Sequence, residues 1–114
     1  MIDNVSIKDT EVKINDNEVA LGHPIEEHLV FEDFVVVRLK LTGEDFPEIH
    51  RNVIAINQDG SIRWRIEKAP EEGYYDSYAG IFDDGGELRA YNLSGMNYKV
   101  DKDTGEVSDG RFVK

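Results

Sequence analysis

The side chains best suited to chemistry gather in one acidic and aromatic segment in the second half of the chain. The segment contains Glu71, Glu72, Tyr74, Tyr75, Asp76 and Tyr78. Paired carboxylates can serve as general acid and base, but this spacing does not fix the distance between them. Tyrosine-rich loops are also common in protein interfaces. Plain loop packing and acid–base catalysis stay open, and as a functional role we predict partner binding.

Histidines are the next candidates, because they are the commonest metal ligands. The chain has three, and His23 and His28 flank Glu26 and Glu27. A structural zinc site usually needs four well-placed ligands, and only carboxylates could complete one here. We interpret the histidines, His50 included, as ordinary surface side chains and predict no metal site.

Residues 101–106 (DKDTGE) resemble part of a calcium-binding loop. The third aspartate and the distal glutamate of that pattern are missing, so a turn stabilised by its own carboxylates is the better interpretation. Gly85-Gly86 is interpreted as a turn rather than a phosphate-binding loop, and no Ser-His-Asp arrangement is evident. The sequence therefore predicts no cofactor and favours a protein that is not an enzyme.

The charge balance is strongly acidic, with 24 acidic and 13 basic residues and a formal net charge of −11. Phosphate backbones repel such a chain, so we expect no nucleic-acid partner, whereas a basic protein is a fitting one. High charge also serves solubility alone. No apolar run approaches the roughly 18 residues of a membrane helix, so we expect no membrane partner. With no cysteine and no signal-peptide pattern at the first residues, we expect a cytoplasmic location.

Alternation of apolar and polar residues with period two dominates the chain and predicts strands. Residues 11–21, with Asn15-Asp16-Asn17 at their centre, predict an N-terminal hairpin. Residues 24–31 fit either a short helix or an edge strand, and we favour the strand. The β-branched run within residues 34–41 is the strongest strand signal.

Three loops that end in glycine, at 58–60, 84–86 and 93–95, predict hairpins within a meander over 34–107. A three-residue loop also fixes which residues lie opposite each other. The predicted pairs are Ile56 with Ile62, Ile54 with Trp64, Phe82 with Leu88, Leu88 with Val100 and Ala90 with Tyr98. One face of the meander then forms the core, which consists of Ile54, Ile56, Ile62, Trp64, Ile66, Phe82, Leu88, Ala90, Met96, Tyr98 and Val100.

The opposite face of this predicted meander is basic. It carries Arg38, Lys40, Arg63, Arg65, Arg89 and Lys99, with Arg89 directly opposite Lys99. Long basic side chains that cover apolar surface and pair with loop acids are the simple interpretation. The functional alternative is a basic stripe, in which Arg63, Arg65 and Arg89 join the tyrosine segment in contacting a partner.

Two stretches resemble repeats of quinoprotein-type (PQQ-like) β-propellers. They are residues 52–64 (NVIAINQDGSIRW), and residues 88–92 (LRAYN) together with 98–107 (YKVDKDTGEV). The resemblance covers about half the chain and implies blade-like meanders, with no quinone-site residues to carry over. A propeller typically has ~4–8 blades, and two units cannot close one.

We therefore predict one all-β domain over residues 1–114, an antiparallel meander of about 8–10 short strands. Its two propeller-blade-like units would curl into a sandwich or open barrel, or copies of the chain would associate to cover exposed strand edges. The favoured function is a non-enzymatic protein-interaction module. A concrete form is an immunity-type protein that neutralises a basic bacterial toxin, because such inhibitors are often small and acidic. The alternative is a small-ligand-binding β domain or an enzyme that uses the concave sheet face.

Overall fold

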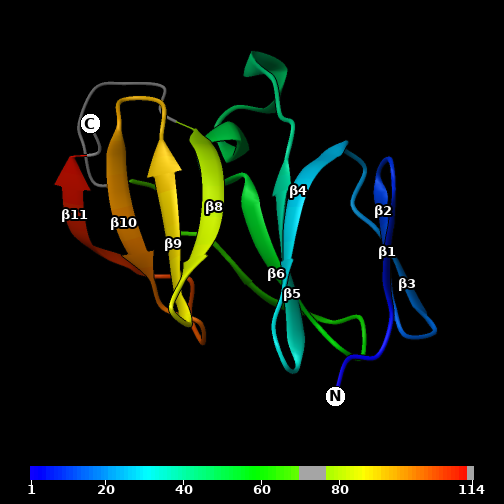
Figure 1. Cartoon of the computed structure of the whole chain (residues 1–114). Coiled ribbons are helices and arrows are strands. Elements are labelled where there is room, and N and C mark those ends of the chain that lie inside the picture. The colour runs from blue at the N-terminus through cyan, green and yellow to red at the C-terminus, as the bar shows by residue number, and fades with distance from the viewer. Residues whose placement is uncertain (70–76, 113–114) are drawn as a thin grey trace.

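The computed structural model describes residues 1–69 and 77–112, which form three small antiparallel sheets (Figure 1). The N-terminal sheet contains β1 (Val5–Lys8), β2 (Glu11–Ile14) and β3 (Asn17–Ala20). The central sheet contains β4 (Ile25–Val30), β5 (Phe34–Leu39), β6 (Val53–Asn57) and β7 (Ile62–Arg65), in that order across the sheet. The C-terminal sheet contains β8 (Tyr78–Asp84), β9 (Glu87–Asn92), β10 (Met96–Val100) and β11 (Val107–Phe112), also in sequence order. The predicted all-β class is confirmed.

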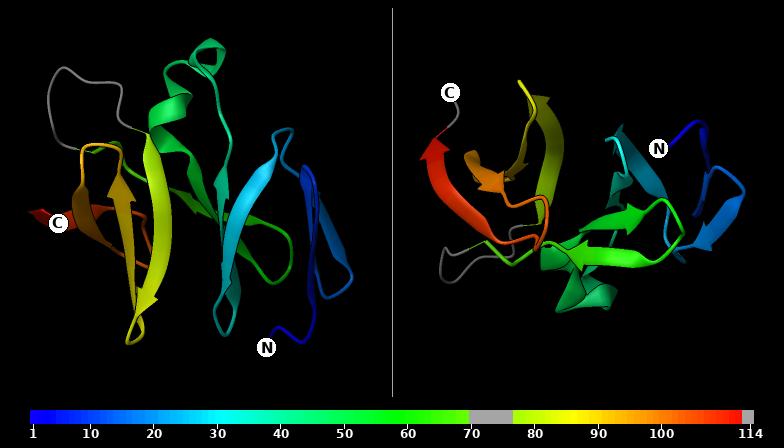
Figure 2. Two further views of the ribbon diagram at one scale, coloured as in Figure 1. Left: turned by 45° about the horizontal axis from the view of Figure 1, so that its top comes forward. Right: turned by 90° about the horizontal axis from the view of Figure 1, so that it is seen from below.

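The central sheet is covered on both faces. Figure 2 shows the C-terminal sheet on one side of it and the N-terminal sheet on the other. All side chains of Phe34–Val37 in β5 and Val53–Ile56 in β6 are buried. Because neighbouring residues of a strand face opposite sides, a continuous apolar run such as β5 fills two cores at once.

The prediction of a single core face is therefore wrong, because two separate apolar clusters form. One lies between the central and C-terminal sheets and contains Phe34, Val36, Val53, Ala55, Trp64, Ile66, Ala69, Tyr78, Ile81, Leu88, Ala90, Tyr98 and Val100. The other lies between the central and N-terminal sheets and contains Val12, Ile14, Val35, Val37, Leu39, Ile54 and Ile56. Ile54 and Trp64, predicted to share a face, belong to different clusters.

A β-bulge explains the position of Trp64. Ile56 lies opposite Ile62 as predicted, but the register shifts at the next residue, so Trp64 lies opposite Ala55 and Arg65 opposite Ile54. An extra residue in one strand moves the side chains that follow to the other face. Ile62, which precedes the shift, is 53% exposed and lies outside both clusters.

The turn between β8 and β9 has two residues instead of the predicted three. Gly85 and Gly86 both have positive φ angles, of 60° and 94°, as tight hairpin turns of this length require. Phe82 consequently lies opposite Arg89, and not opposite Leu88. The loop at 93–95 does follow the prediction, since Tyr98 pairs with Ala90 and Lys99 with Arg89.

Within residues 24–31, Ile25–Val30 form strand β4, as favoured. The N-terminal hairpin is present with a shorter turn at Asn15-Asp16. The sequence did not reveal β1, which adds a third strand to that hairpin. Two short 3₁₀ helices, η1 (Gly43–Asp45) and η2 (Glu48–Arg51), occupy the connection between β5 and β6. The three sheets are separate, and none in the described part of the chain is closed or propeller-like. The blade interpretation is therefore incorrect.

Candidate functional site

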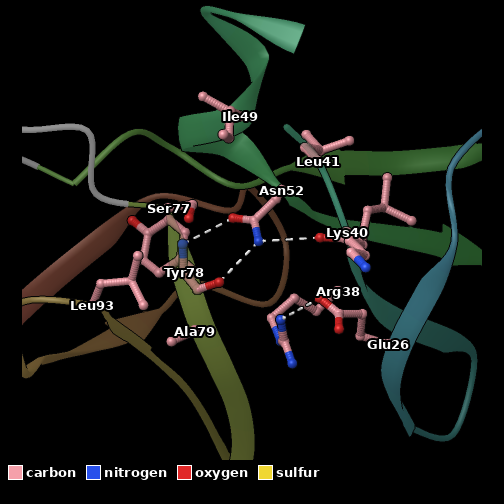
Figure 3. A pocket seen from close by; sticks show the side chains of 11 residues that line it. Glu26, Arg38, Lys40, Leu41, Ile49, Asn52, Ser77, Tyr78, Ala79 and Leu93 are labelled. Carbon is pink, nitrogen blue, oxygen red and sulfur yellow. Dashed lines mark hydrogen bonds and ion pairs between the residues drawn. The ribbon is translucent and has the colours of Figure 1, made fainter. Parts of the chain in front are cut away.

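A pocket of about 260 Å³ opens where the central and C-terminal sheets meet (Figure 3). Glu26 of β4 and Arg38 of β5 line one side, and Lys40 follows at the end of β5. Tyr78 of β8 and the exposed Leu93 line the side of the C-terminal sheet. The pocket thus depends on how the two sheets are joined.

Asn52, directly before β6, joins the sheets at the back of this pocket. Its amide nitrogen donates to the carbonyl oxygens of Leu39 (3.3 Å) and Tyr78 (2.9 Å), and its side-chain oxygen accepts from the backbone N–H of Tyr78 (2.9 Å). The side chain is buried, with 3% of the residue exposed. It therefore takes the place of a strand-to-strand hydrogen-bond pair between β5 and β8.

Glu27 joins the same two sheets a little further along. One of its carboxylate oxygens accepts from Arg38 Nε (2.7 Å) and from the backbone N–H of Ile81 (2.8 Å). Arg38 Nη1 also lies 3.2 Å from Glu26 Oε1. These charge-assisted bonds hold the guanidinium of Arg38 in one orientation at the pocket wall.

The arginines expected to form a basic stripe are instead engaged within the fold. Arg63 donates to the Lys102 carbonyl (2.9 Å) and to Asp103 (2.9 Å), and its guanidinium lies 4.4 Å from the ring centroid of Phe34. Arg65 donates to the Arg51 carbonyl (2.7 Å) and lies 3.3 Å from Glu48. The basic stripe is thus broken up by local partners.

Arg89 differs most from its predicted position on the outward face, because only 2% of the residue is exposed. It donates to Asn97 (2.6 Å), to Glu87 (2.7 Å) and to the carbonyl oxygen of Asp109 (3.1 Å). The hydrogen bond from Arg89, helped by Lys99 at 3.5 Å, holds the pKa of Glu87 below its usual value. Glu87 also bridges the like-charged neighbours Arg89 and Lys99.

Tyr78, the last residue of the predicted partner-binding segment, is 1% exposed, and its hydroxyl donates to the Glu67 carbonyl (2.8 Å). Glu71, Glu72, Tyr74, Tyr75 and Asp76 lie outside the described residues. Direct partner contact by Tyr78 or Arg89 is incompatible with their burial. The role predicted for the other residues stays a prediction.

The histidines are dispersed. His23 lies 3.9 Å from Asp45, and His28 is exposed on β4. The predicted surface position is wrong for His50, which is buried with its ring edge-on to Phe46. Within residues 1–69 and 77–112, no three metal-binding side chains come together. Asp101 accepts from the backbone N–H groups of Asp103 (2.8 Å) and Thr104 (3.2 Å). The prediction of a carboxylate-stabilised turn there is confirmed.

Charge is divided unequally between the two ends of the sheets. The end that holds the N-terminus and the β8–β9 turn, lowest in Figure 1, consists of segments 1–4, 15–16, 31–33, 58–61, 84–86 and 101–106. We name it the acidic end. It carries one lysine, Lys102, and nine exposed acids, which are Asp3, Asp16, Glu32, Asp33, Asp59, Asp84, Asp101, Asp103 and Glu106.

The opposite end has a more even charge. Its described segments are 9–10, 21–24, 40–52, 66–69, 77 and 93–95. They carry five acids, which are Asp9, Glu44, Asp45, Glu48 and Glu67, and three bases, which are Lys40, Arg51 and Lys68. Among the residues that the structure describes, the acidic character is therefore strongest at the acidic end.

Hydrogen bonds and ion pairs link several turns of the acidic end to each other. Ile2 N–H donates to the Glu32 carbonyl (3.1 Å), and Gln58 N–H donates to the Asp33 carbonyl (3.0 Å). Arg63 lies 3.8 Å from Asp33 and 2.9 Å from Asp103, which ties the β10–β11 loop to the central sheet. These contacts connect the N-terminal segment, the β4–β5 and β6–β7 turns and the β10–β11 loop.

Sequence reasoning missed both the pocket and the acidic end. Arg38 and Lys40 gave one usable signal, since residues two apart on a strand share a face. Asn52 gave none, because an asparagine next to a strand usually indicates a turn. The acidic turns were recognised one by one, but their common end follows only from the strand order.

No helix among the residues that the structure describes is long and apolar enough to cross a membrane. A search of curated proteins finds no match. A family model described as a domain of unknown function (DUF7957) matches residues 2–112, and this match gives no support to the propeller resemblance. The chain therefore belongs to the DUF7957 family of domains.

Proposed function

We propose that this protein is a non-enzymatic protein-interaction module that binds a basic protein through its acidic end. The observation that carries the proposal is the unequal division of charge among the described residues, with nine acids and one lysine at that end against five acids and three bases in the described segments of the other. A concentrated field of one sign speeds the encounter with an oppositely charged partner and favours one binding orientation.

Several of these carboxylates are held rigidly, which lowers the cost of ordering them on binding. Asp59 accepts from the hydroxyl (2.6 Å) and the backbone N–H (2.9 Å) of Ser61. These two bonds hold the pKa of Asp59 below its usual value, because they favour the ionised carboxylate. Asp101 is fixed in the same way by its own turn.

An immunity-type protein is the specific form that we propose, with a basic bacterial toxin as the partner. The small size and the net charge of −11 support this form. The first experiment co-expresses the chain with the basic product of a neighbouring gene. Growth rescue and a stable complex would support the immunity role, whereas continued toxicity with both proteins folded would refute it for that partner.

The acidic end is tested with two variants of equal charge. One changes Asp3→Asn, Asp16→Asn, Glu32→Gln and Glu106→Gln, and the control changes Asp9→Asn, Glu11→Gln, Glu18→Gln and Glu44→Gln. All eight side chains are exposed, and each variant changes the formal net charge from −11 to −7.

The association rate with the basic partner is then measured at low salt. We expect the acidic-end variant to associate about tenfold more slowly and the control to stay within about twofold of the natural protein. Equal slowing in both variants would show that net charge alone is responsible, and would contradict a specific surface.

A further inference from the structure

We propose that the pocket between the central and C-terminal sheets binds a small monocarboxylate with a short apolar body. The pocket lies at the end of the molecule opposite to the acidic end, so this inference is independent of the proposed function. Lys40 and Arg38 provide the charge, and Leu41, Ile49 and Leu93 provide the apolar wall.

One cation at the pocket is left without an ion pair among the described residues. Arg38 is paired with Glu26 in the lining and with Glu27, which binds its Nε, whereas Lys40 has no such partner. A single available positive charge matches a carboxylate better than a phosphate monoester, which carries up to about two negative charges at neutral pH.

Donors for such an anion are available at the wall. Arg38 uses Nε for Glu27 and Nη1 for Glu26, and among the described residues Nη2 has no hydrogen-bond partner. Lys40 is exposed and forms no ion pair within the described part of the chain. Residues two apart on a strand lie roughly 6.5–7 Å apart on the same face, so one carboxylate between the two side chains can reach both.

The fixed position of Arg38 also favours binding of a carboxylate at this pocket. The two glutamates hold the guanidinium of Arg38 in place, with 16% of its side chain exposed, so little conformational entropy is lost when an anion binds. Figure 3 shows Arg38 and Lys40 on the central-sheet side of the pocket and Leu93 on the other side.

The volume and the apolar wall of the pocket limit the size and the chemical type of the ligand. A volume of about 260 Å³ is below the roughly 300–1,000 Å³ of sites for drug-sized molecules. Leu93 is 68% exposed at the mouth of the pocket, an arrangement that suits contact with a short hydrocarbon chain.

The test titrates the full chain with hexanoate and follows the backbone amide signals by NMR. Acetate supplies the charge without the apolar body, 1-hexanol the body without the charge, and hexylamine the opposite charge. We expect saturable shifts at Lys40, Leu41 and Ala79 with hexanoate, and much weaker ones with the other three compounds.

Variants then locate the site. Lys40→Gln is expected to weaken hexanoate binding about tenfold, and Leu93→Ser to weaken it by a smaller factor. Lys13→Gln, an exposed lysine on β2 without an ion pair among the described residues, is the matched control and should change nothing. Both test positions are exposed, so the variants should fold.

Three outcomes would overturn the proposal. They are hexanoate shifts that do not saturate, hexylamine binding as strong as hexanoate binding, and equal affinity in the Lys40→Gln and Lys13→Gln variants. None of these results bears on the acidic end, so failure here leaves the proposed function standing.

Discussion

Asn52 and Tyr78 hold each other through two hydrogen bonds of 2.9 Å, one from the Asn52 amide to the Tyr78 carbonyl and one from the Tyr78 N–H to the Asn52 side-chain oxygen. This reciprocal pair has the form of a backbone ladder, although one partner is a side chain. It connects two sheets that share no strand pairing. The position of the pocket between those sheets therefore depends on this asparagine together with Glu27, which joins the same two sheets.

Asn52→Ala should destabilise the protein by about 2–4 kcal/mol, because it leaves buried backbone groups of Tyr78 and Leu39 without these partners. Urea unfolding followed by tryptophan fluorescence measures the loss. Asn4→Ala is the control, since Asn4 is exposed and, among the described residues, only its backbone is hydrogen-bonded. A free energy of unfolding equal in the two variants would show that the Asn52 link is dispensable.

Trp64→Ala should cost about 3–5 kcal/mol of stability, because a large side chain that is 5% exposed leaves a cavity between two sheets. The variant also loses the hydrogen bond from the indole N–H to the Lys102 carbonyl (2.8 Å). Calorimetry of the folded-to-unfolded transition gives the difference.

Ile62→Ala is the control for Trp64→Ala and should cost less than about 1 kcal/mol, since Ile62 is 53% exposed. The sequence pattern treated the two side chains as equal members of one core. A large loss of stability for Ile62→Ala would therefore contradict the bulge and support the predicted register, in which Ile62 and Trp64 share a buried face.

Gly105→Ala should destabilise the fold more than Gly85→Ala, by about 1–3 kcal/mol. Both glycines have positive φ angles, 78° and 60°, so an alanine is strained at either position. Only at Gly105 would the new Cβ also meet the Trp64 ring, at 2.8 Å, whereas at Gly85 it meets no atom within 4 Å. Thermal unfolding of the two variants isolates the steric contact, and equal melting temperatures would argue against it.

Glu87→Gln should be less stable than the natural protein at neutral pH, with the difference disappearing in acid. Glu87 has a pKa below its ordinary value of 4.5 because it accepts a hydrogen bond from Arg89. A carboxyl group whose pKa is lowered by folding stabilises the protein above its unfolded pKa. That stabilisation is lost as the pH falls from about 4.5 through the lower folded value.

Unfolding free energies of both proteins between neutral pH and acid test this expectation. Glu106→Gln is the control, because Glu106 is exposed and forms no ion pair among the described residues. A gap between natural and Glu87→Gln protein that stays constant across the whole range would exclude the ion pair as its cause.

Local features of the sequence were sufficient for the fold class and for most hairpins. Period-two alternation predicted strands at the positions of β4 to β10, and glycine marked the turns after Asn57 and Asn92. The register was less secure, because the bulge at Ala55 and the two-residue turn at Gly85-Gly86 each shift the pairing by one residue. A shift of one residue exchanges the two faces of a strand. An error of one residue in a predicted turn therefore assigns whole sets of side chains to the wrong face of the sheet.

The arginines show why the candidate site was harder to predict than the fold. Arg63 binds Asp103, forty residues away, and Arg38 meets Glu27, eleven residues away on a neighbouring strand. No local pattern reports such partners. A strand position predicted as outward can be buried when another segment covers it, as Asn97 and Asp109 cover Arg89.

The sequence by itself determined an acidic all-β chain, its hairpins and the turn at Asp101, because these depend on contacts between near neighbours. Only the tertiary structure decided that the Phe34–Val37 run fills two cores, that Asn52 joins two sheets, and that nine carboxylates share one end. Each of these depends on how separate sheets pack on each other, and that packing is set by long-range burial rather than by residue spacing.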